Sequence, residues 1–203
     1  MRITIFGSSG RIGREAVNYA LKKGYDVVAF MRPNRYLEVE HPNLTCIKGE
    51  FTDMDKLKKA VLDSDAVVVT LGGFFQESLR ICYYNLMQAT EEVGPKRLIA
   101  LFTPCVVDKG DKFCWNTVFP NVWTSLWFRK GRKGLKICSD RVRYSNLDWT
   151  IVRYLEPVDG EYTGDVKIGF DVKQKIRRAD VAAFMVDQVE DTRFIRQMPI
   201  VGS

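Results

Sequence analysis

The sequence predicts an α/β fold in which a doubly wound parallel sheet forms a single domain. Apolar segments alternate with amphipathic segments along the first half of the chain, a pattern typical of parallel strands joined by right-handed helical crossovers. A glycine-rich turn, Gly7-Ser-Ser-Gly-Arg-Ile-Gly13, directly follows the first apolar segment. The length of 203 residues suits one domain with a full apolar core.

The first half of the chain contains five predicted strands, at 2–6, 26–31, 44–48, 66–71 and 97–102. Helices are expected between them at about 11–22, 53–62 and 76–93, with Asp53 placed to cap the second. The run Ala66-Val-Val-Val-Thr-Leu71 does not alternate with polar residues, so we expect helices to cover both faces of this strand.

The second half of the chain is less regular. We expect an aromatic-rich insertion at about 104–134, within one domain that covers residues 1–203. Beyond it we predict, in order, a helix at about 133–144, a strand at 148–153, a hairpin within 161–173, a helix at 178–189 and a strand at 198–201.

The glycine-rich turn has the spacing and the strand-to-helix context of a dinucleotide-binding loop. In such a loop the pyrophosphate binds at the helix N-terminus, so the fold is expected to be Rossmann-like. Gly7 would form the tight turn, Gly10 would let the backbone approach the phosphates, and Gly13 would let the helix pack closely. The alternative is that the glycines serve only a tight turn.

Arginines follow the second predicted strand, where an NAD site usually has Asp or Glu. Arg32 and Arg35 stand there, and Arg11 in the turn adds a third positive charge. A guanidinium can hold a 2′-phosphate bidentately, whereas a carboxylate would repel it. We therefore predict that the cofactor is NADP, bound as NADPH, in preference to NAD. The alternative is that Arg32 and Arg35 are ordinary surface arginines.

Composition excludes several other classes of protein. Hydrophobic residues make up 46% of the chain and charged residues 28%, as in soluble globular proteins. No segment approaches the about 18 consecutive apolar residues of a membrane span. The chain has five cysteines and no CxxC pair, so we expect reduced thiols and no metal site. The first predicted strand begins at residue 2, which leaves no room for a signal peptide, so we expect a cytoplasmic protein.

The net charge is +6, and the densest basic run is Arg129, Lys130, Arg132, Lys133 and Lys136. Such a run is typical of a solvated helix face, so we expect no nucleic-acid partner.

Candidates for a catalytic acid are scarce. No tyrosine beyond the fifth predicted strand has a lysine four residues later, so the Tyr-x-x-x-Lys pair is not expected there. His41 is the only histidine and precedes the third strand, which argues against histidine acid catalysis, His-ligated zinc and Ser-His-Asp hydrolysis. What remains is hydride transfer to an aromatic acceptor, such as a flavin or a quinone, that takes its protons from water.

Three of the four tryptophans lie in the aromatic-rich insertion, close behind the fifth strand. Three interpretations compete: a lid or substrate wall, a subunit interface, or ordinary core. Docking at a membrane surface is a fourth alternative. The candidates for a substrate wall are Trp115, Trp123 and Trp127.

Four segments in family order resemble the atypical short-chain dehydrogenase/reductase proteins, and more narrowly the NAD(P)H-binding group that includes biliverdin reductase B-type flavin reductases and NmrA-like proteins. They are Gly7–Gly13, Gly49–Asp53, Ser145–Arg153 and Ile176–Ala183. The resemblance supports the fold and the cofactor more specifically than the substrate.

The resemblance implies roles for individual residues along the cofactor. Ser9, Gly10, Arg11 and Ile12 would bind pyrophosphate and ribose, and Arg32 with Arg35 would hold the 2′-phosphate. Glu50 and Phe51 would line the adenine, Leu71, Gly72 and Gly73 would pass along the cofactor ribose, and Thr103 would lie close to the nicotinamide as the one candidate catalytic residue.

Two departures from the family pattern concern the nicotinamide end. The sixth strand ends in Arg153-Tyr-Leu-Glu-Pro157 where the family usually has Arg-Pro and glycines, and Asp140 stands where the family often has Lys or Glu. Two functions remain: an NADPH-dependent reductase, or an NmrA-like sensor that binds NADP without turnover. We expect a monomer or a homodimer in either case.

Overall fold

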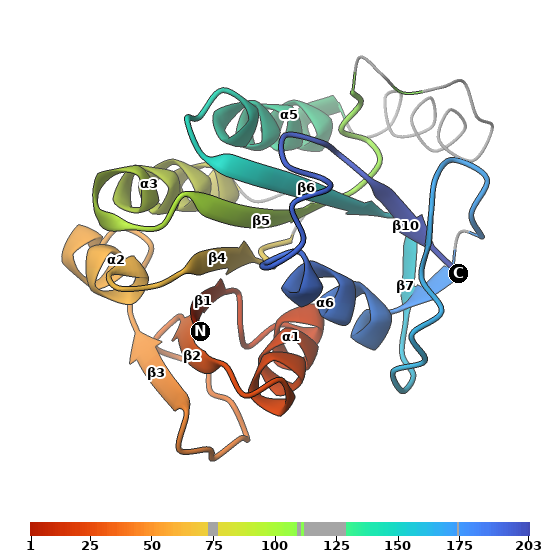
Figure 1. Cartoon of the computed structure of the whole chain (residues 1–203). Helices are drawn as coiled ribbons and strands as arrows, with labels where there is room; N and C mark the ends of the chain where they lie inside the picture. The colour runs from red at the N-terminus through yellow and green to blue at the C-terminus, as the bar shows by residue number, and fades with distance from the viewer. Residues whose placement is uncertain (73–76, 109–110, 112–128, 174) are drawn as a thin grey trace.

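One sheet organises the chain, with helices on both of its faces (Figure 1). The computed structural model describes residues 1–72, 77–108, 111, 129–173 and 175–203. Within this part the sheet has eight strands, in the order β3-β2-β1-β4-β5-β6-β10-β8. The strands are β1 (Arg2–Phe6), β2 (Asp26–Met31), β3 (Leu44–Lys48), β4 (Ala66–Val69), β5 (Arg97–Phe102), β6 (Asp148–Tyr154), β8 (Lys167–Ile168) and β10 (Ile200–Gly202).

Every strand pair from β3 to β10 is parallel, and β8 alone pairs antiparallel, with β10. The sheet order reverses between β1 and β4, so the chain winds outward in both directions from that point. The predicted doubly wound parallel sheet is therefore confirmed. A crevice at such a reversal is where open α/β sheets bind their ligands.

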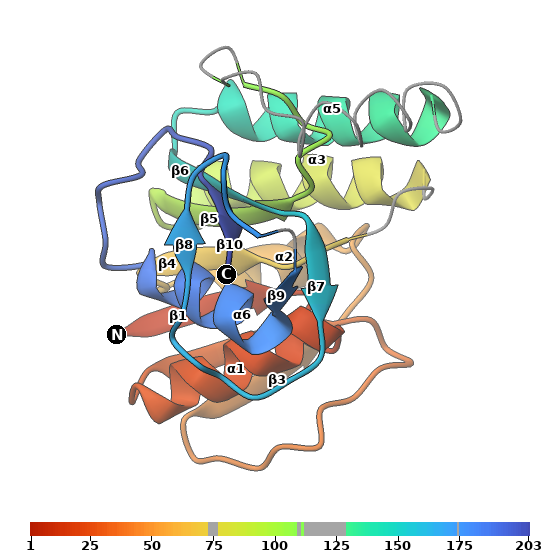
Figure 2. The same cartoon turned by 90° about the vertical axis from the view of Figure 1, so that its right-hand side faces the viewer.

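Two layers of helices cover the sheet (Figure 2). One layer holds α2 (Met54–Val61), α3 (Glu77–Val93) and α5 (Arg129–Arg143), and the other holds α1 (Arg11–Lys22) and α6 (Arg178–Asp187). All four residues of β4 are fully buried: Val67 and Val69 pack with the first layer, and Ala66 and Val68 with the second. This confirms a strand covered on both faces.

The segment between β6 and α6 differs from the prediction. No hairpin forms within 161–173, because β8 pairs with the C-terminal β10 instead. A separate parallel pair joins β7 (Glu156–Val158) to β9 (Lys175–Arg177). The buried carboxylate of Asp180 in α6 accepts hydrogen bonds from the backbone N–H groups of Thr163 and Gly164, at 2.8 and 3.0 Å. These contacts hold the loop around Thr163 and Gly164 against α6.

A buried ion pair fixes the chain that follows β5. Arg153 is 2% exposed, and its two terminal nitrogens each lie 2.6 Å from a carboxylate oxygen of Asp111. The same guanidinium donates to the carbonyl oxygens of Val106 and Met198. Bidentate, charge-assisted contacts of this kind are strong, so β6 holds both the loop after β5 and the segment before β10.

None of the described helices combines the length and the apolar character that a membrane span requires.

Candidate functional site

The glycine-rich turn joins β1 to α1 with little space to spare. Gly7 has a φ of +80°, and the backbone N–H of Gly10 donates to its carbonyl oxygen at 2.9 Å. A Cβ on Gly13 would lie 2.1 Å from the same oxygen, so only glycine lets the helix approach this closely. The geometry agrees with the roles expected of Gly7 and Gly13.

The N-terminus of α1 is open to an anion. Gly10 caps the helix without a side-chain hydrogen bond, and the first turn carries no acidic residue. The first N–H groups of a helix have no intrahelical acceptor and carry partial positive charge. The turn therefore presents donors suited to a phosphate group.

Buried hydroxyl groups anchor the turn to its neighbouring strands. The Ser8 side chain donates to the carbonyl oxygen of Phe30 at 3.0 Å, and the Thr70 hydroxyl donates to that of Phe6, also at 3.0 Å. These bonds link the carboxyl ends of β1, β2 and β4, which together surround one cavity.

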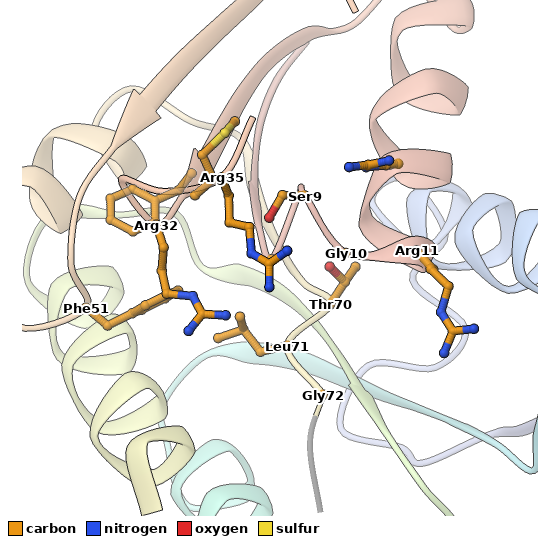
Figure 3. Close-up of a pocket in the computed structure, with 13 residues that line it drawn as sticks. Ser9, Gly10, Arg11, Arg32, Arg35, Phe51, Thr70, Leu71 and Gly72 are labelled. Atoms are coloured by element: carbon orange, nitrogen blue, oxygen red, sulfur yellow. The ribbon is translucent and has the colours of Figure 1, made fainter. Parts of the chain in front are cut away.

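The cavity has a volume of about 420 Å³ (Figure 3). Its lining residues come from the glycine turn, the first turn of α1 and the ends of β2, β3 and β4. They are Gly7, Ser9, Gly10, Arg11, Arg14, Phe30, Met31, Arg32, Arg35, Phe51, Thr70, Leu71 and Gly72.

Nine of the predicted cofactor residues line this cavity: Gly7, Ser9, Gly10, Arg11, Arg32, Arg35, Phe51, Leu71 and Gly72. Ile12 and Gly13 are buried in the first turn of α1, and neither Glu50 nor Thr103 is part of the lining. Gly73 lies outside the described residues.

Four further residues line the cavity that were not predicted from the sequence: Arg14, Phe30, Met31 and Thr70. Arg14 had a usable signal, because it follows Arg11 by three residues on the same face of a helix. Thr70 and Met31 lie at strand ends, where the strand pattern alone does not show which side chains face a ligand.

Positive charge dominates the cavity. Arg11, Arg14, Arg32 and Arg35 are exposed, and none of them forms an ion pair with a described residue. No Asp or Glu is part of the lining. Four guanidinium groups without an acidic partner among the described residues suit a ligand with several phosphate charges.

Aromatic side chains form the wall opposite the arginines of the turn. The rings of Phe30 and Phe51 pack edge to face with centroids 5.2 Å apart, and Phe6 supports both from below. Phe30 is fully buried and Phe51 is 7% exposed, so the surface that this wall presents to the cavity is apolar but small.

The candidate catalytic residue, Thr103, lies at the carboxyl end of β5, the strand that pairs with β4. Thr103 directly follows β5, and its buried hydroxyl has no hydrogen-bond partner among the described residues. Asp140 accepts a hydrogen bond from Lys136 on the surface of α5. Trp115, Trp123 and Trp127 lie outside the described residues.

Tyr19 and Lys23 have the Tyr-x-x-x-Lys spacing, but they lie more than two turns along α1 from Gly10. Tyr19 and Lys23 both contact the carboxylate of Asp187 in α6, at 3.3 and 2.8 Å. Burial and Asp187 raise the pKa of Tyr19 to about 12. The pair therefore joins two helices and is remote from the cavity.

Comparisons with known proteins support the fold and an NAD(P)H cofactor. The sequence model of a family described as NAD(P)H-binding matches residues 7–192. The chain is similar to the photosystem II assembly factor Ycf39 of Synechocystis sp., with 23% identity over 100% of this chain and 63% of that protein. A bifunctional pinoresinol-lariciresinol reductase of Linum usitatissimum is 28% identical over 46% of this chain and 32% of its own length. The chain thus spans less than two thirds of either relative.

Solved structures with the same fold cover the whole chain. A short-chain dehydrogenase/reductase from Veillonella parvula, crystallised in complex with NADP, aligns with a TM-score of 0.82 and 21% identity, over 100% of this chain and 94% of that one. ChuY, an anaerobilin reductase from Escherichia coli, aligns with a TM-score of 0.76 and 19% identity, over 100% and 97%.

Proposed function

The chain belongs to the NAD(P)H-binding family, and within it we propose an NADPH-dependent reductase that transfers hydride to an aromatic acceptor such as a flavin or a quinone. The observation that carries the preference for NADPH is a cavity lined by four arginines, none of which forms an ion pair with a described residue, and by no described acidic residue. NADH lacks the 2′-phosphate that such a charge distribution favours.

The residues around the cavity suggest how the dinucleotide would lie. Its pyrophosphate would bind at the N-terminus of α1 beside Ser9 and Gly10, and its 2′-phosphate between Arg32 and Arg35. The adenine would pack against Phe51, and Leu71, Gly72 and Gly73 would follow the ribose toward Thr103. When bound, NADPH supplies a hydride from its nicotinamide ring.

The proposed acceptor follows from the scarcity of candidate catalytic acids in the sequence. No tyrosine beyond β5 has a lysine four residues later, and the single histidine, His41, precedes β3. Reduced flavins and quinones take protons from water, so the protein would act mainly by positioning the acceptor against the nicotinamide. Trp115, Trp123 and Trp127 are the proposed stacking residues on the acceptor side.

The same observation supports a second candidate, an NmrA-like regulator that binds NADP without turnover. A screen that follows NADPH absorbance across flavins, quinones and tetrapyrroles separates the two functions. The reductase predicts oxidation with at least one acceptor, and this oxidation must disappear in Gly10→Val. Tight NADPH binding without oxidation across the screen would favour the regulator.

A further inference from the structure

A tyrosine lies at the carboxyl end of β6, on the same edge of the sheet as the glycine-rich turn. Tyr154 is the last residue of this strand. Phe102 and Arg153 are register partners in the parallel pair of β5 and β6, so the residues that follow them, Thr103 and Tyr154, are neighbours across the two strands. The family pattern usually has proline where Tyr154 stands, so this phenol is a departure of the chain from its family.

The Tyr154 side chain lies on the face of the sheet that α1 and α6 cover. Side chains alternate between the two faces of a strand, and Val152, two residues earlier, is buried in the core beneath these helices. Tyr154 packs against the same core and is partly exposed. Its hydroxyl forms no hydrogen bond with a described residue. The phenol is thus held by its ring, and its polar end remains available to a ligand.

Arg11 relates Tyr154 to the cavity at the glycine-rich turn. Arg11 is the first residue of α1 and lines this cavity, and its side chain points away from the two arginines that follow β2 (Figure 3). Burial raises the pKa of Tyr154, and the charges of Arg178 and Arg11 oppose this rise, so both guanidinium groups lie near the phenol. Arg178 is already paired with Asp159. Tyr154 therefore lies beside the end of the cavity at which Arg11 stands.

In the proposed orientation of the dinucleotide, this is the nicotinamide end of the site. The adenine would lie at Phe51, beside β2 and β3, and the pyrophosphate at the N-terminus of α1. The sheet order is β3-β2-β1-β4-β5-β6 on this side, so the nicotinamide would extend in the opposite direction, toward β5 and β6. An acceptor stacked on the nicotinamide would then meet the Tyr154 hydroxyl.

We propose that Tyr154 binds the electron acceptor and that its hydroxyl donates a hydrogen bond to the acceptor oxygen that becomes negative when the hydride arrives. This inference rests on the proposed reductase and narrows its acceptor to a quinone, or to another aromatic compound with a carbonyl oxygen conjugated to the ring. The site selects such acceptors because the phenol can donate only to an oxygen or nitrogen that gains electron density.

The step balances with NADPH, the quinone and water. The C4–H bond of the dihydronicotinamide breaks, and its hydride forms a new bond to the quinone, which gives NADP and a hydroquinone anion. This anion takes one proton from water and leaves hydroxide. Tyr154 keeps its own proton, and its hydrogen bond strengthens as charge develops, because hydrogen bonds to ionised acceptors are the stronger ones.

Binding of 4-nitrophenol to the protein saturated with NADP tests the site without turnover. The absorbance of this probe distinguishes phenol from phenolate, so a pH titration gives the pKa of the bound probe. This pKa should be about 1 lower in the unmodified protein than in Tyr154→Phe, a tenfold preference for the phenolate. Tyr144→Phe is the matched control, because Tyr144 is 83% exposed and precedes the start of β6, at the opposite edge of the sheet. A probe that does not bind, or an equal pKa of the bound probe in Tyr154→Phe, would overturn the proposal.

Turnover with 1,4-naphthoquinone tests the role of Tyr154 in the reaction, with thermal melts confirming that each variant folds. Tyr154→Phe should lower kcat/KM for the quinone about tenfold and leave the Kd of NADPH unchanged, whereas Tyr144→Phe should change neither. An unchanged kcat/KM in Tyr154→Phe would overturn the proposal. If the unmodified protein oxidises NADPH with no acceptor, the reductase itself fails, and the pKa of bound 4-nitrophenol still decides whether Tyr154 stabilises an oxyanion beside the cofactor.

Discussion

Replacing Arg32 with glutamine should selectively weaken NADPH binding. Arg32 is exposed, lines the cavity at the glycine-rich turn and forms no ion pair with a described residue, so its loss leaves no buried charge behind. A hydrogen bond to a charged group contributes about 1.5–3 kcal/mol. At about 1.4 kcal/mol for each tenfold change, Arg32→Gln should raise the Kd of NADPH roughly 10- to 150-fold.

The affinity for NADH should change little in the same variant, because NADH has no 2′-phosphate. Isothermal titration calorimetry with both cofactors measures the two effects. Arg196→Gln is the control, since Arg196 is exposed, forms no ion pair with a described residue and does not line the cavity. Raising the salt concentration should narrow the preference for NADPH, because exposed charges are screened. Equal affinities of the unmodified protein for NADPH and NADH would refute the reasoning.

The remaining predictions separate binding, folding and chemistry. Gly10→Val should abolish NADPH binding with little change in Tm, because only the Gly7 carbonyl oxygen lies within 4 Å of the added Cβ, at 3.1 Å; retained binding would count against the site. Gly13→Ala should instead lower stability by at least about 1–3 kcal/mol in urea unfolding, because overpacking against backbone cannot relax, and an unchanged midpoint would contradict the tight helix contact. Thr103→Val should slow flavin or quinone reduction by far less than the about 10²–10⁴-fold expected for loss of a general acid; abolished turnover with intact NADPH binding would disprove acid-free transfer. At least one of the variants Trp115→Ala, Trp123→Ala and Trp127→Ala should raise the KM for the acceptor and leave the affinity for NADPH unchanged. Normal kinetics in all three variants would indicate that these tryptophans belong to the core or to a subunit interface.

The bounds of β1, β2, β3 and β5 coincide with the predicted ones. β1, β2 and β5 are largely buried apolar runs, whereas β3 lies at the edge of the sheet and is partly exposed. β4 ends at Val69, two residues before its predicted end, since the Thr70 side chain turns back to the Phe6 carbonyl and Leu71 lines the cavity. The hydrophobic pattern of the sequence cannot predict the residue at which the chain leaves the sheet.

Long-range pairing was beyond the reach of the sequence pattern. The two-residue strand β8 is exposed, and its partner β10 lies more than thirty residues later in the chain, so a local hairpin was the wrong expectation. Likewise, the ion pair between Arg153 and Asp111 spans 42 residues and gives no local signal. The candidate site could be predicted better than the long-range pairing, because the glycine turn and the strand ends, which are local features of the sequence, position most of its residues.

The most direct test of the account is the kcat/KM for NADPH and for NADH with an acceptor that supports turnover. We predict steady oxidation of NADPH, a preference for NADPH over NADH of about tenfold or more, and loss of that preference in Arg32→Gln. Calorimetrically verified NADPH binding without oxidation by any flavin, quinone or tetrapyrrole would contradict the reductase and leave the regulator.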